Sequence, residues 1–142
     1  MATLSVTNAV AGVPVGRKLQ VIEVMADFST TNLTTADTFQ ALTIPANTLV
    51  VAAGVEVVTV TANAGCVLDM GDSDDDLYVS ALPATAVGHE INNAAGTMKL
   101  YTAADTIDLT VDTATFDGKA RVFAVICDMG SGETAISSFT SA

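Results

Sequence analysis

Two segments near the C-terminal end constrain the fold of this chain most strongly. Residues 104–112 alternate apolar and polar side chains, and this period of two predicts a strand with one buried face. Residues 119–128 are apolar on both sides over most of their length, which is typical of a strand inside a sheet. The dipeptide Asp117-Gly118 between them is a strong turn signal, so we expect the two segments to pair as a hairpin.

The composition indicates the same fold class for the rest of the chain. Half of the 142 residues are hydrophobic, yet only 5% are aromatic and none is Trp, because Val and Ala supply most of the apolar mass. Val and the abundant Thr are β-branched and suit a pleated sheet. The length is that of one domain with a real core. We therefore predict an all-β chain that forms a single-domain antiparallel β-sandwich, jelly-roll-like, with an extended N-terminal arm.

Short strands at regular spacing are expected along most of the chain. The expected strands cover residues 19–28, 38–44, 48–61, 66–70, 77–82, 97–101, 104–112 and 119–128. The run 48–61 is interrupted at Gly54, so it is either two strands or one strand with a bulge at the glycine. The segment 77–82 is either an edge strand or a helical turn, and 83–96 is expected to be irregular.

This pattern divides the chain into three parts. Residues 1–18 are expected to form an N-terminal arm, 19–130 the β-sandwich domain, and 131–142 a polar C-terminal tail. A segment without its own core either folds onto a neighbour or stays disordered.

The charge balance limits the partners of the chain. Sixteen acidic residues face five basic ones, which gives a net charge of −11. Such a surface repels phosphate, so we expect no nucleic-acid partner and no anionic membrane partner. The charge serves solubility, or it attracts a basic protein surface or divalent cations.

One acidic cluster is a candidate metal site. Asp72, Asp74 and Asp76 alternate like the first three ligands of a calcium loop. Leu77 replaces the glycine that an EF-hand requires, and Pro83 stands where the bidentate Glu belongs, so the segment is not an EF-hand. The three carboxylates are candidate ligands for Ca²⁺, and the alternative is a turn whose Asp side chains bind local backbone N–H groups.

The residues offer no catalytic constellation. His89 stands alone in the sequence and is expected at the surface. Cys66 and Cys127 lie in apolar segments and are expected to be buried thiols, although a disulfide between them stays open. We therefore predict that the chain is not an enzyme and needs no cofactor beyond the calcium considered above.

Four segments resemble a known class of proteins. They are Ile-Pro-Ala-Asn-Thr at the start of 44–58, Leu-Asp-Met-Gly-Asp in 68–74, the run 101–110, and Gly-Lys-Ala-Arg-Val in 117–125. Their order is similar to that of small virion proteins of tailed bacteriophages, particularly from marine and cyanobacterial phages, over about residues 40–129.

The resemblance implies a capsid decoration (cement) protein or another minor structural protein, with no catalytic residues to carry over. It implies a location on the capsid surface of the virion, the major capsid protein as partner, and a homotrimer. Under this hypothesis the arm 1–18 reaches onto a neighbouring subunit or the shell. The alternative is a tail- or fibre-associated module, or a carbohydrate-binding β-sandwich.

Overall fold

The structure is a computed structural model that describes residues 4–6, 16–92, 98–130 and 139–141. All regular secondary structure in these residues is β-strand, and the all-β prediction is confirmed. The strands are β1 (Leu4–Val6), β2 (Leu19–Asp27), β3 (Phe39–Ile44), β4 (Thr48–Thr59), β5 (Val67–Gly71), β6 (Val79–Pro83), β7 (Gly88–Ile91), β8 (Lys99–Tyr101), β9 (Asp105–Asp112), β10 (Lys119–Asp128) and β11 (Phe139–Ser141). The part of the chain that the structure describes contains no helix that could span a bilayer.

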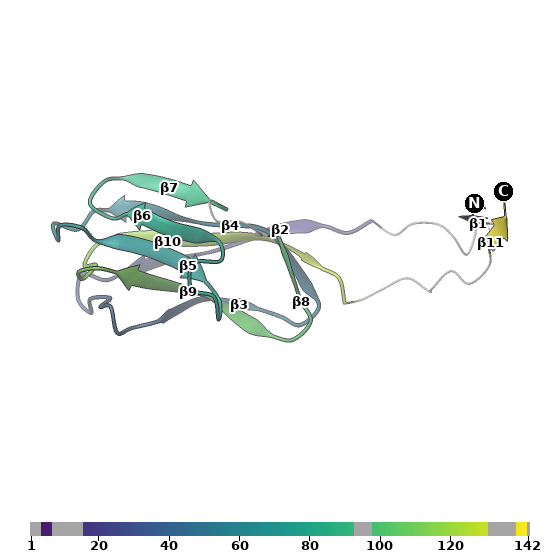
Figure 1. Ribbon diagram of the computed structural model, residues 1–142, viewed down its shortest axis with the longest axis horizontal. Helices are drawn as coiled ribbons and strands as arrows, with labels where there is room; N and C mark the ends of the chain where they lie inside the picture. Colours follow the sequence, from purple (N-terminus) through teal and green to yellow (C-terminus); the bar gives the residue numbers. More distant parts are fainter. Residues whose placement is uncertain (1–3, 7–15, 93–97, 131–138, 142) are drawn as a thin grey trace.

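Two antiparallel sheets form the sandwich. The five-stranded sheet has the order β2-β10-β4-β7, with β8 also paired to β4, and the four-stranded sheet has the order β3-β9-β5-β6. Figure 1 shows the strands of both sheets running along the long axis of the molecule.

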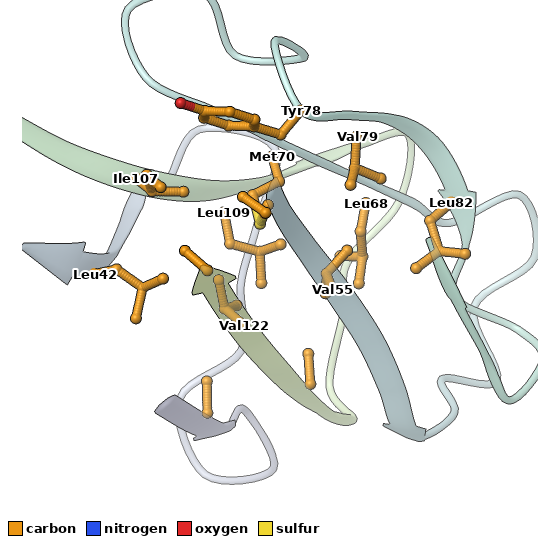
Figure 2. Packing of buried hydrophobic residues seen from close by; sticks show 14 of the residues in the cluster. Leu42, Val55, Leu68, Met70, Tyr78, Val79, Leu82, Ile107, Leu109 and Val122 are labelled. Atoms are coloured by element: carbon orange, nitrogen blue, oxygen red, sulfur yellow. The ribbon is translucent and has the colours of Figure 1, made fainter. Parts of the chain in front are cut away.

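The core lies between the two sheets because alternate side chains of each strand point inward. Val55 and Val122 come from the five-stranded sheet, and Leu68, Met70 and Leu109 come from the four-stranded sheet; all five are fully buried. In Figure 2 these side chains point toward one another across the sandwich. Burying each such side chain contributes about 1.5–3 kcal/mol, so this interface holds the two sheets together.

The predicted hairpin of residues 104–112 and 119–128 is wrong. β9 pairs with β3 and β5 in one sheet, whereas β10 pairs with β2 and β4 in the other. The connection crosses the sandwich because Phe116 is fully buried and exchanges backbone hydrogen bonds of 2.9 and 3.0 Å with Leu33. Gly118 does not supply a hairpin turn. A Cβ there would lie 1.9 Å from the carbonyl oxygen of Thr59, so the glycine permits a close approach to β4.

Gly54 also has a different role from the expected one. β4 is one strand, and its register with β10 shifts between Lys119 and Ala120 and between Val125 and Ile126, not at the glycine. A Cβ on Gly54 would lie 2.7 Å from the Phe123 ring, so the glycine makes room for that side chain.

Two further segments differ from or sharpen the expectation. The region expected to be irregular contains β7, a short strand beside β4. The 77–82 segment is the strand β6 at the edge of its sheet and not a helical turn.

The strands β1 and β11, from the first and last described segments, form a separate two-stranded sheet. β1 and β11 pair antiparallel, with Leu4 opposite Ser141, and Figure 1 shows this ribbon apart from the two sheets. The remainder of the predicted arm up to residue 15, and the predicted tail except β11, lie outside the described residues. The role predicted for the arm stays a prediction.

Candidate functional site

The acidic loop, residues 71–76, connects β5 to β6 and is shaped by its own backbone. The N–H of Asp72 donates to the Asp74 carbonyl oxygen at 3.1 Å, and the N–H of Asp74 donates to Asp72 Oδ1 at 3.1 Å. Such Asp side-chain bonds to nearby N–H groups are typical of tight turns. A Cβ on Gly71 would lie 1.8 Å from the Asp74 oxygen, so only glycine fits at the start of the loop.

Asp72 points into the protein and joins the acidic loop to β8 of the other sheet. Its side chain has no exposed surface, and its Oδ2 forms an ion pair with Lys99 and accepts a hydrogen bond from the Tyr101 hydroxyl at 2.9 Å. The hydroxyl of Tyr78 lies 2.8 Å from that of Tyr101. Since the Tyr101 proton goes to the carboxylate, Tyr78 is the donor in this second bond. Asp72 thus ends a buried chain of hydrogen bonds between the two sheets.

The surroundings of these groups shift their pKa values. Burial alone would raise the pKa of Asp72, but the bonds from Lys99, the Asp74 N–H and Tyr101 outweigh it, and the pKa is lowered. Burial raises the pKa of Tyr78 to about 12, although its bond to Tyr101 opposes the shift. Burial also raises the pKa of Tyr101, together with its bonds to Tyr78 and Asp72. At neutral pH this series of hydrogen-bonded groups therefore consists of the Asp72 carboxylate and the neutral phenols of Tyr101 and Tyr78.

The structure separates the three candidate metal ligands. Asp72 is neutralised by Lys99, whereas Asp74 and Asp76 are exposed together with Asp75, which lies outside the predicted ligand set. One carboxylate oxygen from each of Asp74, Asp75 and Asp76 lies within 4.8 Å of the others. Hydrogen bonding to Asp76, with smaller effects of burial and of neighbouring carboxylates, raises the pKa of Asp74. Calcium binding at this loop stays a prediction, and its candidate ligands are now the three exposed residues Asp74, Asp75 and Asp76.

Beside the acidic loop, the outer face of the four-stranded sheet contains an acidic groove of about 450 Å³. Its carboxylates come from the loop before β3, from β5, from the acidic loop and from the end of β9: Asp37, Asp69, Asp75, Asp76 and Asp112. Burial raises the pKa of Asp69, the neighbouring carboxylates raise it further, and the Ala81 N–H opposes the shift with a hydrogen bond of 2.7 Å. The groove thus gathers much of the negative charge on one face.

The other residues with possible catalytic side chains are one histidine and two cysteines. His89 is exposed on β7, opposite Glu56 of β4. Cys66 and Cys127 are buried free thiols, as expected. Burial, with a smaller effect of Asp117, raises the pKa of Cys66 and keeps that thiol protonated.

Comparison with known proteins identifies the fold. No protein-family model matches the chain, and no curated protein matches it in sequence. Three phage capsid structures contain chains with a similar fold.

A chain of the capsid asymmetric unit of cyanophage Pam1 matches with a TM-score of 0.62 and 21% identity, over 82% of this chain and 89% of that one. A chain of the Ralstonia phage GP4 capsid matches with a TM-score of 0.65 and 15% identity, over 86% and 92%. A chain of the acid-stable capsid of Helicobacter pylori bacteriophage KHP30 matches with a TM-score of 0.55 and 13% identity, over 92% and 95%. The resemblance to phage virion proteins is therefore confirmed at the level of the fold.

Proposed function

We propose that this chain is a structural, non-enzymatic protein of a phage virion, and specifically a capsid decoration protein that binds the outer surface of the shell and stabilises it. The observation that supports this proposal is the fold shared with chains of three phage capsid structures, over 89–95% of the length of those chains. The order of the sequence motifs favours the same class.

The charge supports the outer rather than the inner surface of the shell. Packaged DNA is a dense polyanion, and a chain with a net charge of −11 is repelled by it. An acidic face can instead meet basic patches of the major capsid protein, which is the proposed partner. The proposed oligomer is a homotrimer.

The proposed mechanism is burial of surface across the joints between capsomers. Each contact adds apolar burial and hydrogen bonds that must be broken before the shell opens. The sandwich suits this role because one cluster of buried apolar side chains joins its two sheets, and close-packed protein interiors have low compressibility.

Shells that lack the protein test the proposal directly. Purified protein is added to such shells, bound copies are counted by electron microscopy, and the temperature of shell opening is measured with a DNA-accessible dye. We expect saturable binding and a higher opening temperature. A second sample lacking residues 2–16 tests the arm: reduced occupancy is expected, and normal occupancy would remove its role. Absence of binding to shells, or binding to a glycan array instead, would contradict the decoration function.

A further inference from the structure

The outer face of the five-stranded sheet carries large apolar side chains in contact with solvent. Leu19 and Val21 of β2 are 62% and 68% exposed, Leu100 of β8 is 51% exposed, and Ile91 of β7 is 48% exposed. Half-buried Phe123 and Val125 of β10 lie between them. We call these six residues the apolar face.

The strand register shows that these residues form one continuous surface. Directly opposite residues of antiparallel strands point to the same side of the sheet. Val125 lies opposite Val21, and Phe123 lies opposite Gly54, which in turn lies opposite Ile91. The ring of Phe123 and the side chain of Ile91 both come within 3 Å of where a Cβ of Gly54 would be, so they cover the glycine together.

A second row crosses the whole width of the sheet. Cys127 of β10 lies opposite both Leu19 of β2 and Leu49 of β4, and Leu49 lies opposite Leu100 of β8. Cys127 is itself buried and Leu49 is half-buried, but the row joins the exposed side chains of Leu19 and Leu100, so the apolar face extends from the β2 edge to β8. Exposed apolar surface of this kind usually marks an interaction site.

The charged residues beside the apolar face almost cancel. Arg121 forms ion pairs with Glu56 at 3.3 Å and with Glu23 at 3.6 Å, and Lys119 forms one with Asp27 at 3.4 Å. These three carboxylates and two cations leave a charge of −1, against −11 for the whole chain. By contrast, the acidic groove on the other sheet contains five carboxylates.

We propose that copies of this chain associate with one another through the apolar face. Strongly acidic copies repel each other, so a contact between them has to exclude the acidic groove and use a surface whose charges are already paired. The apolar face meets this requirement and gains from removal of its leucine, isoleucine and valine side chains from water. The inference deepens the proposed function, on which it rests for its biological setting, by naming the surface of subunit contact in the proposed oligomer. The acidic groove then stays accessible to the shell protein.

The test compares the mass of the purified wild-type protein with the masses of two lysine variants by light scattering after size exclusion. Val21→Lys places a cation in the apolar face, and Thr43→Lys places one on the exposed outer side of β3 in the other sheet. Both positions are exposed β-branched residues on edge strands, and both changes reduce the net charge equally. A difference between the variants therefore cannot come from the overall charge.

We expect the wild type and Thr43→Lys to have a multiple of the mass of one chain, and Val21→Lys to have the mass of a single chain. Leu100→Lys, on the far side of the same face, is expected to behave like Val21→Lys. Unchanged far-ultraviolet circular dichroism spectra of all variants would show that the fold is retained.

Two results would overturn the inference: a wild type that is monomeric, or lysine variants of the apolar face that keep the wild-type mass. If the wild type is monomeric, its shell binding is then compared with that of Val21→Lys. Loss of binding in the variant alone would show that the face binds the shell protein instead of a copy. The mass measurement uses no shells, so its result is independent of the shell-binding test. A monomeric wild type that binds shells would contradict only this inference, and an oligomeric wild type that does not bind shells would contradict only the decoration function.

Discussion

Replacing Lys99 by Met is expected to destabilise the protein through Asp72. Removing one partner of a fully buried ion pair costs about 3–5 kcal/mol, because the other charge stays buried. The Lys99 side chain is 39% exposed, and Asp72 keeps its bonds from Tyr101 and the Asp74 N–H, so the expected loss is smaller. We expect the free energy of unfolding to fall by about 2 kcal/mol. In urea this corresponds to a midpoint lower by about 1 M.

The matched control is Lys119→Met, which breaks an exposed ion pair of the same type. Lys119 lies 3.4 Å from Asp27, and the two side chains are 45% and 48% exposed. Exposed pairs contribute little, so the control is expected to change the free energy of unfolding by less than about 0.5 kcal/mol.

The pH dependence separates a buried charge from a general packing loss. In the wild type the lowered pKa of Asp72 means that its contribution is fully present above the ordinary value of 3.8 and is lost as the pH falls through the folded-state pKa. In Lys99→Met, burial acts with less opposition and is expected to raise the folded-state pKa above the ordinary value. Acidification from about pH 7 to about pH 4.5 then favours the folded variant, so the gap to the wild type narrows. A gap that is constant with pH, or equal losses in the two lysine variants, would refute this reasoning.

The remaining predictions concern the sheet crossing, the thiols and the acidic loop. Gly118→Ala would place a methyl group 1.9 Å from a backbone oxygen of β4, and we expect it to lower the free energy of unfolding in urea by about 2 kcal/mol or more. The control is Gly88→Ala, where no atom lies within 4 Å of the added methyl group, and we expect it to leave the free energy of unfolding unchanged. Equal effects of the two changes would contradict the crossing geometry. Cys66 and Cys127 are expected to react with a thiol reagent only after unfolding, since both are buried, and rapid labelling of the native protein would contradict this. Calcium binding to the exposed carboxylates of the acidic loop is expected to raise the melting temperature of the protein in excess calcium relative to chelator. Identical melting curves under the two conditions would exclude a calcium site in this loop.

Local sequence pattern predicted the strands well but not their partners. The alternation in 104–112 and the apolar run in 119–128 give β9 and β10, because burial on one face or two is a local property. Which strands pair depends on where the connection goes. Here Phe116 is buried in the core, and the connection that contains it leads from one sheet to the other. The dipeptide Asp117-Gly118 alone does not show that the chain changes sheets at this point.

The same limit applies to the candidate site. The spacing of Asp72, Asp74 and Asp76 suggested equivalent ligands, but Asp72 meets Lys99, which is 27 residues away and lies on the other sheet. A pattern of acids in one loop cannot show which of them finds a cation across the core.

The apolar face could not be found from periodicity either. Strands β2 and β10 contain apolar residues at both inward and outward positions, which is typical of strands covered on both sides. Only the sheet order and the strand register place Val21, Val125, Ile91 and Leu100 on one surface.

A cryo-electron microscopy map of the virion that contains this chain tests the central claim most directly. We expect density on the outer surface of the capsid that fits the two-sheet sandwich, with copies in contact through the five-stranded sheet and with the acidic groove away from that contact. Density for the chain only in the tail or fibres, or none on the outer capsid surface, would contradict the proposed decoration function.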